Sequence, residues 1–173
     1  MKGIKIIIAG VLLLFLANSC ELFDGLDDYK DPKVEYTATF PLNGEWYVTL
    51  DYYDSTTTSW IVDAYGIGYN KILLYNLASN TADSIWLDDN GLWPSKTKIS
   101  CNPSTKVFTP CQSVDVDGLD VTIYGGSVVL NGTTTLGGNK SDSINIEITW
   151  GDDPGSYYRL AGYRRTGFLE DEH

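Results

Sequence analysis

The chain has 173 residues and a net charge of −11 at pH 7, because 23 acidic residues stand against 12 basic ones. This balance disfavours nucleic acids and anionic membrane surfaces as partners, and we expect no nucleic acid to bind. The one histidine, His173, is the last residue, which argues against Ser-His-Asp and Cys-His hydrolases and against most zinc sites. We therefore expect neither a metal nor a cofactor.

Residues 1–19 have the pattern of a signal peptide. Lys2 and Lys5 precede an apolar run of eleven residues, Ile6 to Leu16, which is shorter than the roughly 20 residues that span a membrane. The segment ends in Ser19-Cys20 and resembles the lipobox of bacterial lipoproteins, whose cysteine carries a lipid and becomes the mature N-terminus. The resemblance implies lipidation at Cys20 and an anchor in the outer membrane, on its periplasmic or cell-surface side. The alternative is an ordinary secretory signal followed by an incidental cysteine.

Residues 20–40 are predicted to form the lipidated N-terminus and a flexible stalk, because Glu21 to Lys33 is acidic and poor in apolar residues. The remaining residues, 41–173, are long enough for one domain with a sizeable core. Without Lys2 and Lys5 the chain keeps 10 basic and 23 acidic residues, so the net charge of the mature protein is −13. Such a charge favours solubility.

The first strand of the domain is predicted between Gly44 and Tyr53. Its residues alternate, with Trp46, Val48 and Leu50 on one face, which is the two-residue period of a strand with one buried face. Gly125-Gly126 has two interpretations, a hairpin turn or a bend within one long strand. Further strands are predicted at residues 60–62, 72–77, 84–88, 96–101, 107–109, 119–124, 143–150 and 157–165.

The fold class that these strands predict is all-β. No window longer than about ten residues has a helical period, and about eight to ten short strands at regular spacing are typical of a sandwich or a barrel. The connections resemble hairpins and favour an antiparallel up-and-down barrel, because closure removes the exposed edges of the sheet.

Two cysteines lie in the predicted domain, Cys101 and Cys111. In an exported protein, a disulfide between them is one interpretation. A tight hairpin at residues 102–104 would instead set Cys101 near Val107 and leave two free thiols. The sequence leaves both interpretations open.

Gly44-Glu45-Trp46 resembles the Gly-x-Trp signature of lipocalins and other calycins. In those barrels, an arginine of the last strand packs over the tryptophan and closes one end. The resemblance implies that Gly44, Trp46, Arg164 and Arg165 close this barrel, with Arg159 as a further candidate.

Four further blocks are similar to a family of bacterial lipoproteins, the lipid-binding putative hydrolases, whose fold is calycin-like. The blocks lie at residues 74–78, 83–89, 142–144 and 162–168, and the resemblance runs from about Gly44 to Asp171. Where the family commonly has Thr-Tyr-Asn-Thr, this chain has Leu74-Tyr75-Asn76-Leu77. The resemblance implies a barrel and an apolar ligand, and no catalytic residue is carried over.

The leading hypothesis for function is a binding protein that holds a small apolar or amphipathic, lipid-like ligand in its barrel without catalysis. The cavity for such a ligand should exceed about 300 Å3 and open to solvent. Cavities of this kind are apolar, so the aromatic residues are the candidates for ligand binding. Those we select are Trp46, Tyr69, Trp86 and Trp93.

Two other hypotheses are kept. In one, the barrel is a solid structural subunit whose exposed aromatic face docks onto an envelope protein. In the other, two carboxylates within about 10 Å of each other form a hydrolytic site. The candidates for that pair are Asp88, Asp89, Asp142, Glu147, Asp152 and Asp153. The segment from Asp115 to Asp120 resembles part of a calcium loop but lacks its final glutamate, so an acidic turn is predicted there.

Overall fold

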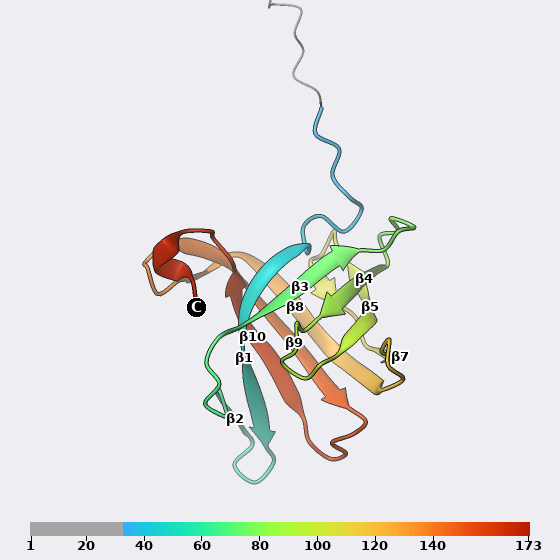
Figure 1. The fold of residues 1–173 in the computed structure, drawn as a ribbon, viewed down its shortest axis with the longest axis vertical. Coiled ribbons are helices and arrows are strands. Elements are labelled where there is room, and N and C mark those ends of the chain that lie inside the picture. Colours follow the sequence, from blue (N-terminus) through green and yellow to red (C-terminus); the bar gives the residue numbers. More distant parts are fainter. Residues whose placement is uncertain (1–32) are drawn as a thin grey trace, which may run out of the picture. The chain divides into compact units, whose positions relative to one another are not determined.

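The computed structural model describes residues 33–173, so the predicted signal peptide and Cys20 lie outside the described residues. Tyr36–His173 forms one compact unit (Figure 1). Residues 36–40, which the sequence assigned to the stalk, belong to this unit. Thr39 is fully buried and donates a hydrogen bond from Oγ1 to Asn43 Oδ1 at 2.8 Å. The Tyr36 ring lies 3.8 Å from that of Phe40.

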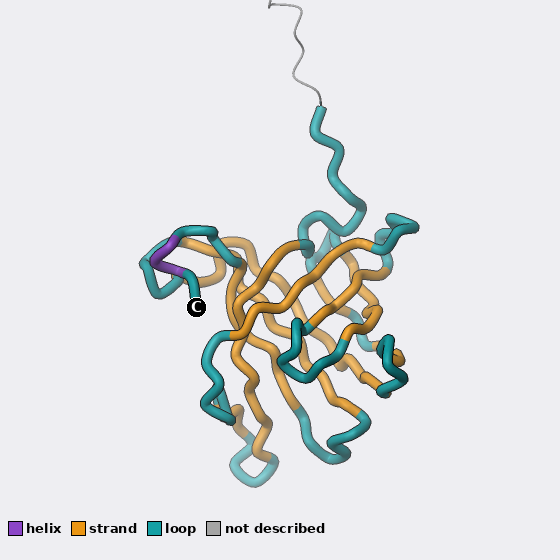
Figure 2. Tube along the Cα trace, viewed as in Figure 1, coloured by secondary structure: helices purple, strands orange, loops and turns teal. Residues whose placement is uncertain are grey.

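The described residues form ten strands and one short 3-10 helix near the C-terminus (Figure 2). No helix among residues 33–173 is long and apolar enough to cross a membrane. The strands are β1 (Gly44–Asp54), β2 (Ser59–Ile61), β3 (Asn70–Asn76), β4 (Ser84–Asp88), β5 (Lys96–Asn102), β6 (Val107–Phe108), β7 (Cys111–Val114), β8 (Asp120–Thr134), β9 (Lys140–Trp150) and β10 (Tyr158–Arg164), and the 3-10 helix is η2 (Leu169–Asp171).

Eight of the strands close into an antiparallel barrel, which confirms the predicted fold. Their order around the barrel is β10-β9-β8-β6-β5-β4-β3-β1, and β10 pairs with β1 to complete the circle. The two additional strands lengthen the wall, because β2 pairs with the second half of β1 and β7 pairs with the first half of β8. Most neighbouring strands are consecutive in the chain, as hairpin connections require, whereas β1 pairs with β3, β6 with β8 and the closing pair joins β1 to β10.

β1 is the strand at which the barrel closes. Trp46 lies opposite Ile72 of β3 on one side and opposite Arg164 of β10 on the other. In the closing pair, Val48 faces Gly162, where the two backbones approach so closely that a Cβ on Gly162 would lie 1.9 Å from the Tyr47 carbonyl oxygen. The glycine therefore permits the contact that makes the sheet a barrel.

Of the two interpretations of Gly125-Gly126, the structure has the bend in one long strand. β8 runs without a turn through both glycines, and its register with β9 shifts between Ile123 and Gly125. A Cβ on Gly126 would lie 2.3 Å from the Asn145 carbonyl oxygen of β9, so only a glycine fits at this bulge.

β7 is a strand that the sequence did not predict. It continues the course of β6 after an interruption at Thr109-Pro110, where the proline has no N–H to give to the sheet. Its residues, Cys-Gln-Ser-Val, alternate only weakly between apolar and polar. Pairing with β8 from Cys111 opposite Ile123 to Val114 opposite Asp120 nevertheless holds it in the wall.

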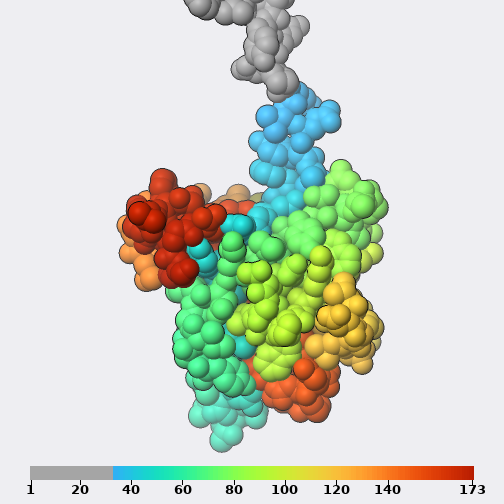
Figure 3. Space-filling view, in the orientation of Figure 1, coloured from blue at the N-terminus to red at the C-terminus, as the bar shows by residue number. Residues whose placement is uncertain are grey.

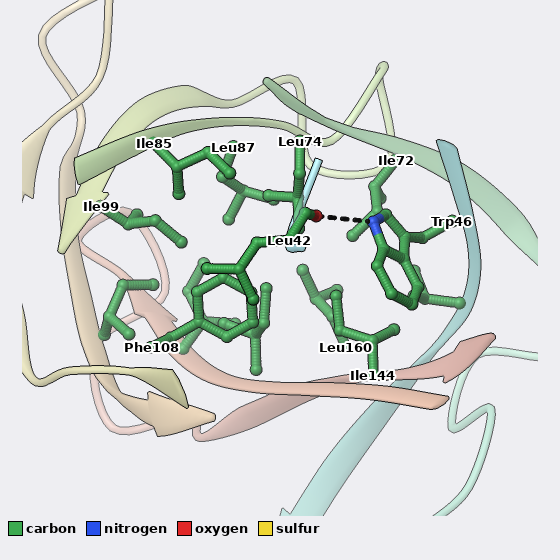
Figure 4. Packing of buried hydrophobic residues seen from close by; sticks show 14 of the residues in the cluster. Leu42, Trp46, Ile72, Leu74, Ile85, Leu87, Ile99, Phe108, Ile144 and Leu160 are labelled. Carbon is green, nitrogen blue, oxygen red and sulfur yellow. Dashed lines mark hydrogen bonds between the residues drawn. The ribbon is translucent and has the colours of Figure 1, made fainter. Parts of the chain in front are cut away.

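Inward-facing side chains of all the barrel strands form one apolar core (Figure 4). Trp46 and Leu160 are fully buried on one side of the barrel, and Ile85 is fully buried on the opposite wall. Leu42, from the turn before β1, covers the end of the barrel at which Trp46 lies, and its carbonyl accepts a hydrogen bond from Trp46 Nε1 at 3.3 Å. We call this end of the barrel the Trp46 end.

The C-terminal segment packs against the outer face of β1 and β10 (Figure 3). Tyr47 donates a hydrogen bond to Glu172 at 2.6 Å, and Asp171 is buried. Although burial acts to raise it, the pKa of Asp171 is lowered to about 2 by hydrogen bonds that include those from Thr166, Asn139 and the Gly137 backbone. Asp171 therefore remains a carboxylate that ties the C-terminal segment to the β8–β9 turn.

Candidate ligand-binding site

Arg164 covers Trp46 at the Trp46 end. Its guanidinium carbon lies 4.2 Å from the centroid of the indole ring, which is the geometry of a cation–π contact. The same guanidinium donates to the carbonyls of Asn43 and Pro41, the latter at 2.9 Å, and its Nε donates to Asp142 at 3.0 Å. A Cβ on Gly44 would lie 2.7 Å from Arg164 Nη1, so the absent side chain leaves room for the arginine.

Arg165 does not take part in this contact. Its side chain lies on the outside of the barrel, where it pairs with Glu45 at 2.8 Å and Glu172 at 2.6 Å. The third arginine, Arg159, lies over Trp60 instead, with its guanidinium carbon 4.5 Å from that ring. The structure thus brings Gly44, Trp46 and Arg164 together and leaves Arg165 in a separate network.

The four aromatic residues predicted to bind a ligand do not line one cavity. Trp46 is fully buried in the core, and Trp86 lies on the outer face of β4 with the Lys96 ammonium 5.7 Å from its ring. Tyr69 stacks on His173 with a ring separation of 4.6 Å. Trp93 stacks on Trp150 at 4.7 Å and donates from Nε1 to Asp152 at 3.1 Å. Each of the four therefore has a packing partner of its own.

Cys101 and Cys111 are free thiols in the structure, the second of the two interpretations left open by the sequence. Cys101 lies opposite Phe108 and points into the core, whereas Cys111 lies on β7 and accepts a hydrogen bond from the Ser100 backbone at 3.3 Å. Burial, with a smaller contribution from Asp83, raises the pKa of the Cys101 thiol to about 11. It is therefore a packing residue and not a nucleophile near neutral pH.

His173 is held by aromatic rings and is not frayed as a terminal residue would be. Its ring stacks on Tyr69 and lies edge-on to Tyr47 at 4.8 Å, and its Nε2 contacts the Tyr163 hydroxyl. Among the described residues, no serine, threonine or cysteine side chain hydrogen-bonds to it. Within residues 33–173, His173 therefore forms no nucleophile–base pair of the Ser-His or Cys-His type.

The candidate carboxylates are mostly occupied by structural contacts. Asp89 is buried between β4 and β5 and accepts hydrogen bonds from the backbone amides of Gly91, Trp93 and Ser95, while burial raises its pKa. Asp115 accepts from the amides of Asp117 and Leu119, as the predicted acidic turn requires. Residues 33–173 contain no group of three or more His, Cys, Asp or Glu side chains suited to a metal ion.

A groove at the Trp46 end combines an apolar wall with a basic group. Its volume is about 330 Å3, and we call it the end groove. Phe40 and Leu130, which form part of the wall, are 47% and 53% exposed, although both are large apolar residues. Its lining residues are Phe40, Pro41, Lys106, Leu130, Asp142 and Arg164. Each of three other surface grooves is lined mainly by outward-facing or loop residues, while Figure 4 shows core side chains packed together inside the barrel.

Lys106 gives the end groove its accessible positive charge. Arg164 and Asp142 also line the groove, but they form an ion pair with each other at 3.0 Å. Lys106 lies in the turn between β5 and β6 and is half-buried, and no described carboxylate forms an ion pair with it. An apolar surface beside an ammonium group suits an amphipathic molecule with an anionic head.

A comparison with known families agrees with these features. A sequence model of the family described as "lipid-binding putative hydrolase" matches residues 31–169, a range that includes all ten strands. The chain belongs to this family. A search of curated proteins finds no match for the chain. Membership of the lipid-binding putative hydrolase family and the barrel fit a lipid-binding role.

The end groove of this lipid-binding putative hydrolase was not predicted from the sequence. Its residues come from five separate segments of the chain, and Phe40 was assigned to the stalk. One signal was present at Val128-Val129-Leu130, because three consecutive apolar residues cannot all face the inside of a strand. Val128 does face the core, while Val129 and Leu130 are both exposed.

Proposed function

We propose that this protein binds a small amphipathic molecule, with an acyl-like chain and an anionic head, in the end groove and without catalysing a reaction. The observation that carries the proposal is the placement of Lys106 at the edge of an apolar wall formed by Phe40, Pro41 and Leu130. The volume of about 330 Å3 lies at the lower end of the range for small-molecule sites, roughly 300–1,000 Å3. A short chain therefore fits better than a long one.

The ligand lies outside the barrel in this proposal, because the core residues occupy the interior. The acidic charge of the whole chain acts against an anionic ligand at long range. Salt screens that field beyond about 8–10 Å, so the head is governed by the groups that it touches. Among the charged groups that line the groove, Asp142 is neutralised by Arg164. Lys106 is therefore the group that attracts the anionic head.

The experiment is calorimetric titration of the purified protein with dodecanoate. Leu130→Ser removes part of the apolar wall and is expected to weaken binding roughly tenfold, the effect of losing most of one buried leucine contact. Lys106→Gln removes a partly exposed charge and is expected to weaken binding about two- to fivefold. The same Lys106 variant should bind dodecanol, which has no anionic head, as well as the natural chain does.

Matched control variants are available at other places on the barrel. Ile61→Ser changes an apolar residue on β2 that is 46% exposed, and Lys98→Gln changes an exposed lysine on β5. Both should bind dodecanoate as the natural chain does. A natural chain that takes up no dodecanoate, or a Leu130→Ser variant with undiminished affinity, would contradict the proposal.

The anchor is the second part of the proposal. We infer that Cys20 carries a lipid that holds the domain to the outer membrane, supported by the lipobox-like residues that precede it. Tyr36, at which the compact unit begins, packs on Phe40 of the end groove. Tyr36 lies 16 positions after Cys20, so the chain between them can extend at most roughly 55 Å. The end groove is therefore tethered within that distance of the membrane surface.

The anchor is tested by metabolic labelling. Cys20→Ser should abolish incorporation of labelled palmitate and release the protein from the membrane fraction, since no acyl chain remains to hold it. The control is Cys111→Ser, which should leave both labelling and fractionation unchanged. Labelling that persists in the Cys20→Ser variant would show that the lipid is attached at another residue, and it would contradict the proposal.

A further inference from the structure

Four aromatic side chains form a continuous strip on the outer wall of the barrel, away from the end groove. They are Tyr53 of β1, Trp60 of β2, Tyr124 of β8 and Tyr157, which precedes β10. Successive ring centroids are 5.3 Å apart from Trp60 to Tyr53, 5.9 Å from Tyr53 to Tyr157, and 4.9 Å from Tyr157 to Tyr124. We call this set the aromatic strip. It crosses the strands, and all four residues remain half-buried or exposed, with Tyr124 49% exposed.

A groove of about 310 Å3 continues from the aromatic strip beneath the β9–β10 turn. Tyr124 and Tyr157 belong to both the strip and the groove, so the two form one surface. The other side of the groove is polar, because hydroxyl and carboxylate groups line it. These come from Asp120, Thr122, Thr149, Asp153 and Ser156.

Two polar side chains beside the strip, Glu147 and Arg159, are held in place before any ligand arrives. Tyr157 donates a hydrogen bond to Glu147, and burial together with this contact raises the pKa of Tyr157, so its hydroxyl stays protonated. Arg159 packs over Trp60 and donates to the buried carboxylate of Asp51 from Nε at 3.0 Å and from Nη2 at 2.6 Å. Side chains that are already ordered lose little further entropy on binding.

An aromatic strip bordered by hydroxyl and carboxylate groups matches the chemistry of a sugar ring. Such a ring has an apolar face of C–H groups that packs on aromatic rings, and hydroxyl groups at its edge that exchange hydrogen bonds with polar side chains. An acyl chain has no hydrogen-bonding groups and would leave Asp120, Thr122 and Thr149 without partners. The surface is therefore better suited to a saccharide than to a lipid.

The charges of the site favour a neutral saccharide. Asp120, Asp153 and Glu147 are all acidic, and the neighbouring Arg159 is already paired with Asp51. A uronic acid or sulfated sugar would meet these carboxylates without a free cation to compensate them. We propose that the aromatic strip and its groove bind a neutral oligosaccharide, with sugar rings on Tyr124 and Tyr157 and their hydroxyl groups against the polar wall. This site is independent of the lipid-binding function proposed above.

The test is native affinity electrophoresis of the purified protein in gels that contain xyloglucan, galactomannan or amylopectin, with polygalacturonate as an anionic comparison. We expect at least one neutral polysaccharide to retard the protein and polygalacturonate to leave its migration unchanged. Tyr124→Ala with Trp60→Ala should raise the dissociation constant at least about tenfold, as truncation of aromatic anchor residues does. Migration that none of the neutral polysaccharides alters, or that only polygalacturonate alters, would overturn the proposal.

Trp86→Ala is the matched control, because Trp86 is also an outward-facing aromatic residue but lies on β4, on another part of the wall. It should leave retardation unchanged. Thermal unfolding of each variant separates lost binding from lost structure. If the double variant is unfolded, the single variant Tyr124→Ser is tested in the same gels. The exposed ring of Tyr124 contributes little to the core, so this variant should remain folded. Retardation that survives in a folded variant of the strip would also overturn the proposal.

Discussion

Replacing Gly162 with alanine is expected to prevent the barrel from closing in its observed register. The new Cβ would lie 1.9 Å from the Tyr47 carbonyl oxygen and 2.8 Å from Val48 Cα. These are backbone atoms of β1, so no rotation of a side chain relieves the clash, and the two strands must separate. We expect the free energy of unfolding to fall by about 3 kcal/mol or more, the upper end of what overpacking costs.

Urea denaturation followed by circular dichroism measures this loss. Ala161→Gly is the matched control, because it changes the neighbouring residue of the same strand in the opposite direction. Ala161→Gly should lower the free energy of unfolding by about 1 kcal/mol or less, the ordinary penalty for a glycine in a strand. If Gly162→Ala proved as stable as the natural chain, β1 and β10 could not be paired as described.

Arg164→Met is expected to have the second-largest effect. Methionine keeps much of the length of the side chain but removes the group that lies over Trp46 and donates to Pro41, Asn43 and Asp142. Three acceptors would then lose a charged donor at a partly buried position. We expect a loss of about 2–4 kcal/mol in the free energy of unfolding, since hydrogen bonds to charged groups contribute about 1.5–3 kcal/mol each and do not add in full.

Arg165→Met provides the comparison within the same strand end. Arg165 pairs with Glu45 and Glu172 on the surface, and exposed pairs of this kind contribute about 0–1 kcal/mol. Urea denaturation of both variants should therefore separate them clearly. Equal losses for the two would mean that the contact with Trp46 adds nothing to stability.

Most of the barrel could be predicted from sequence, because a strand with one buried face has a simple period. Ser84–Asp88 was predicted with the bounds that the structure has, since Ile85 and Leu87 alternate with polar or outward residues. The same period also explains one misplaced candidate. Trp86 lies between two inward-facing residues, so its side chain must point outward and cannot reach the inside of the barrel.

Groups that meet only through the closed barrel could not be predicted from local patterns. The end groove joins Phe40, Lys106 and Leu130, which have no common spacing, and its shape depends on how two turns pack beside the ends of β8, β9 and β10. The aromatic strip has the same origin, because its residues come from β2, β1, the turn before β10, and β8, and it follows no single strand. Nor does sequence give the position of the C-terminal residues, which are fixed by Tyr47 and Tyr69.

The register of the closing pair determines when the protein can finish folding. Asn43 and Arg164, which meet at the Trp46 end, are 121 positions apart. A nascent chain therefore leaves one edge of β1 unpaired until β10 has been synthesised, and unpaired edges are sites of aggregation. We expect the slow step of folding to be this late docking of β10, and partial chains that lack it to depend on chaperones.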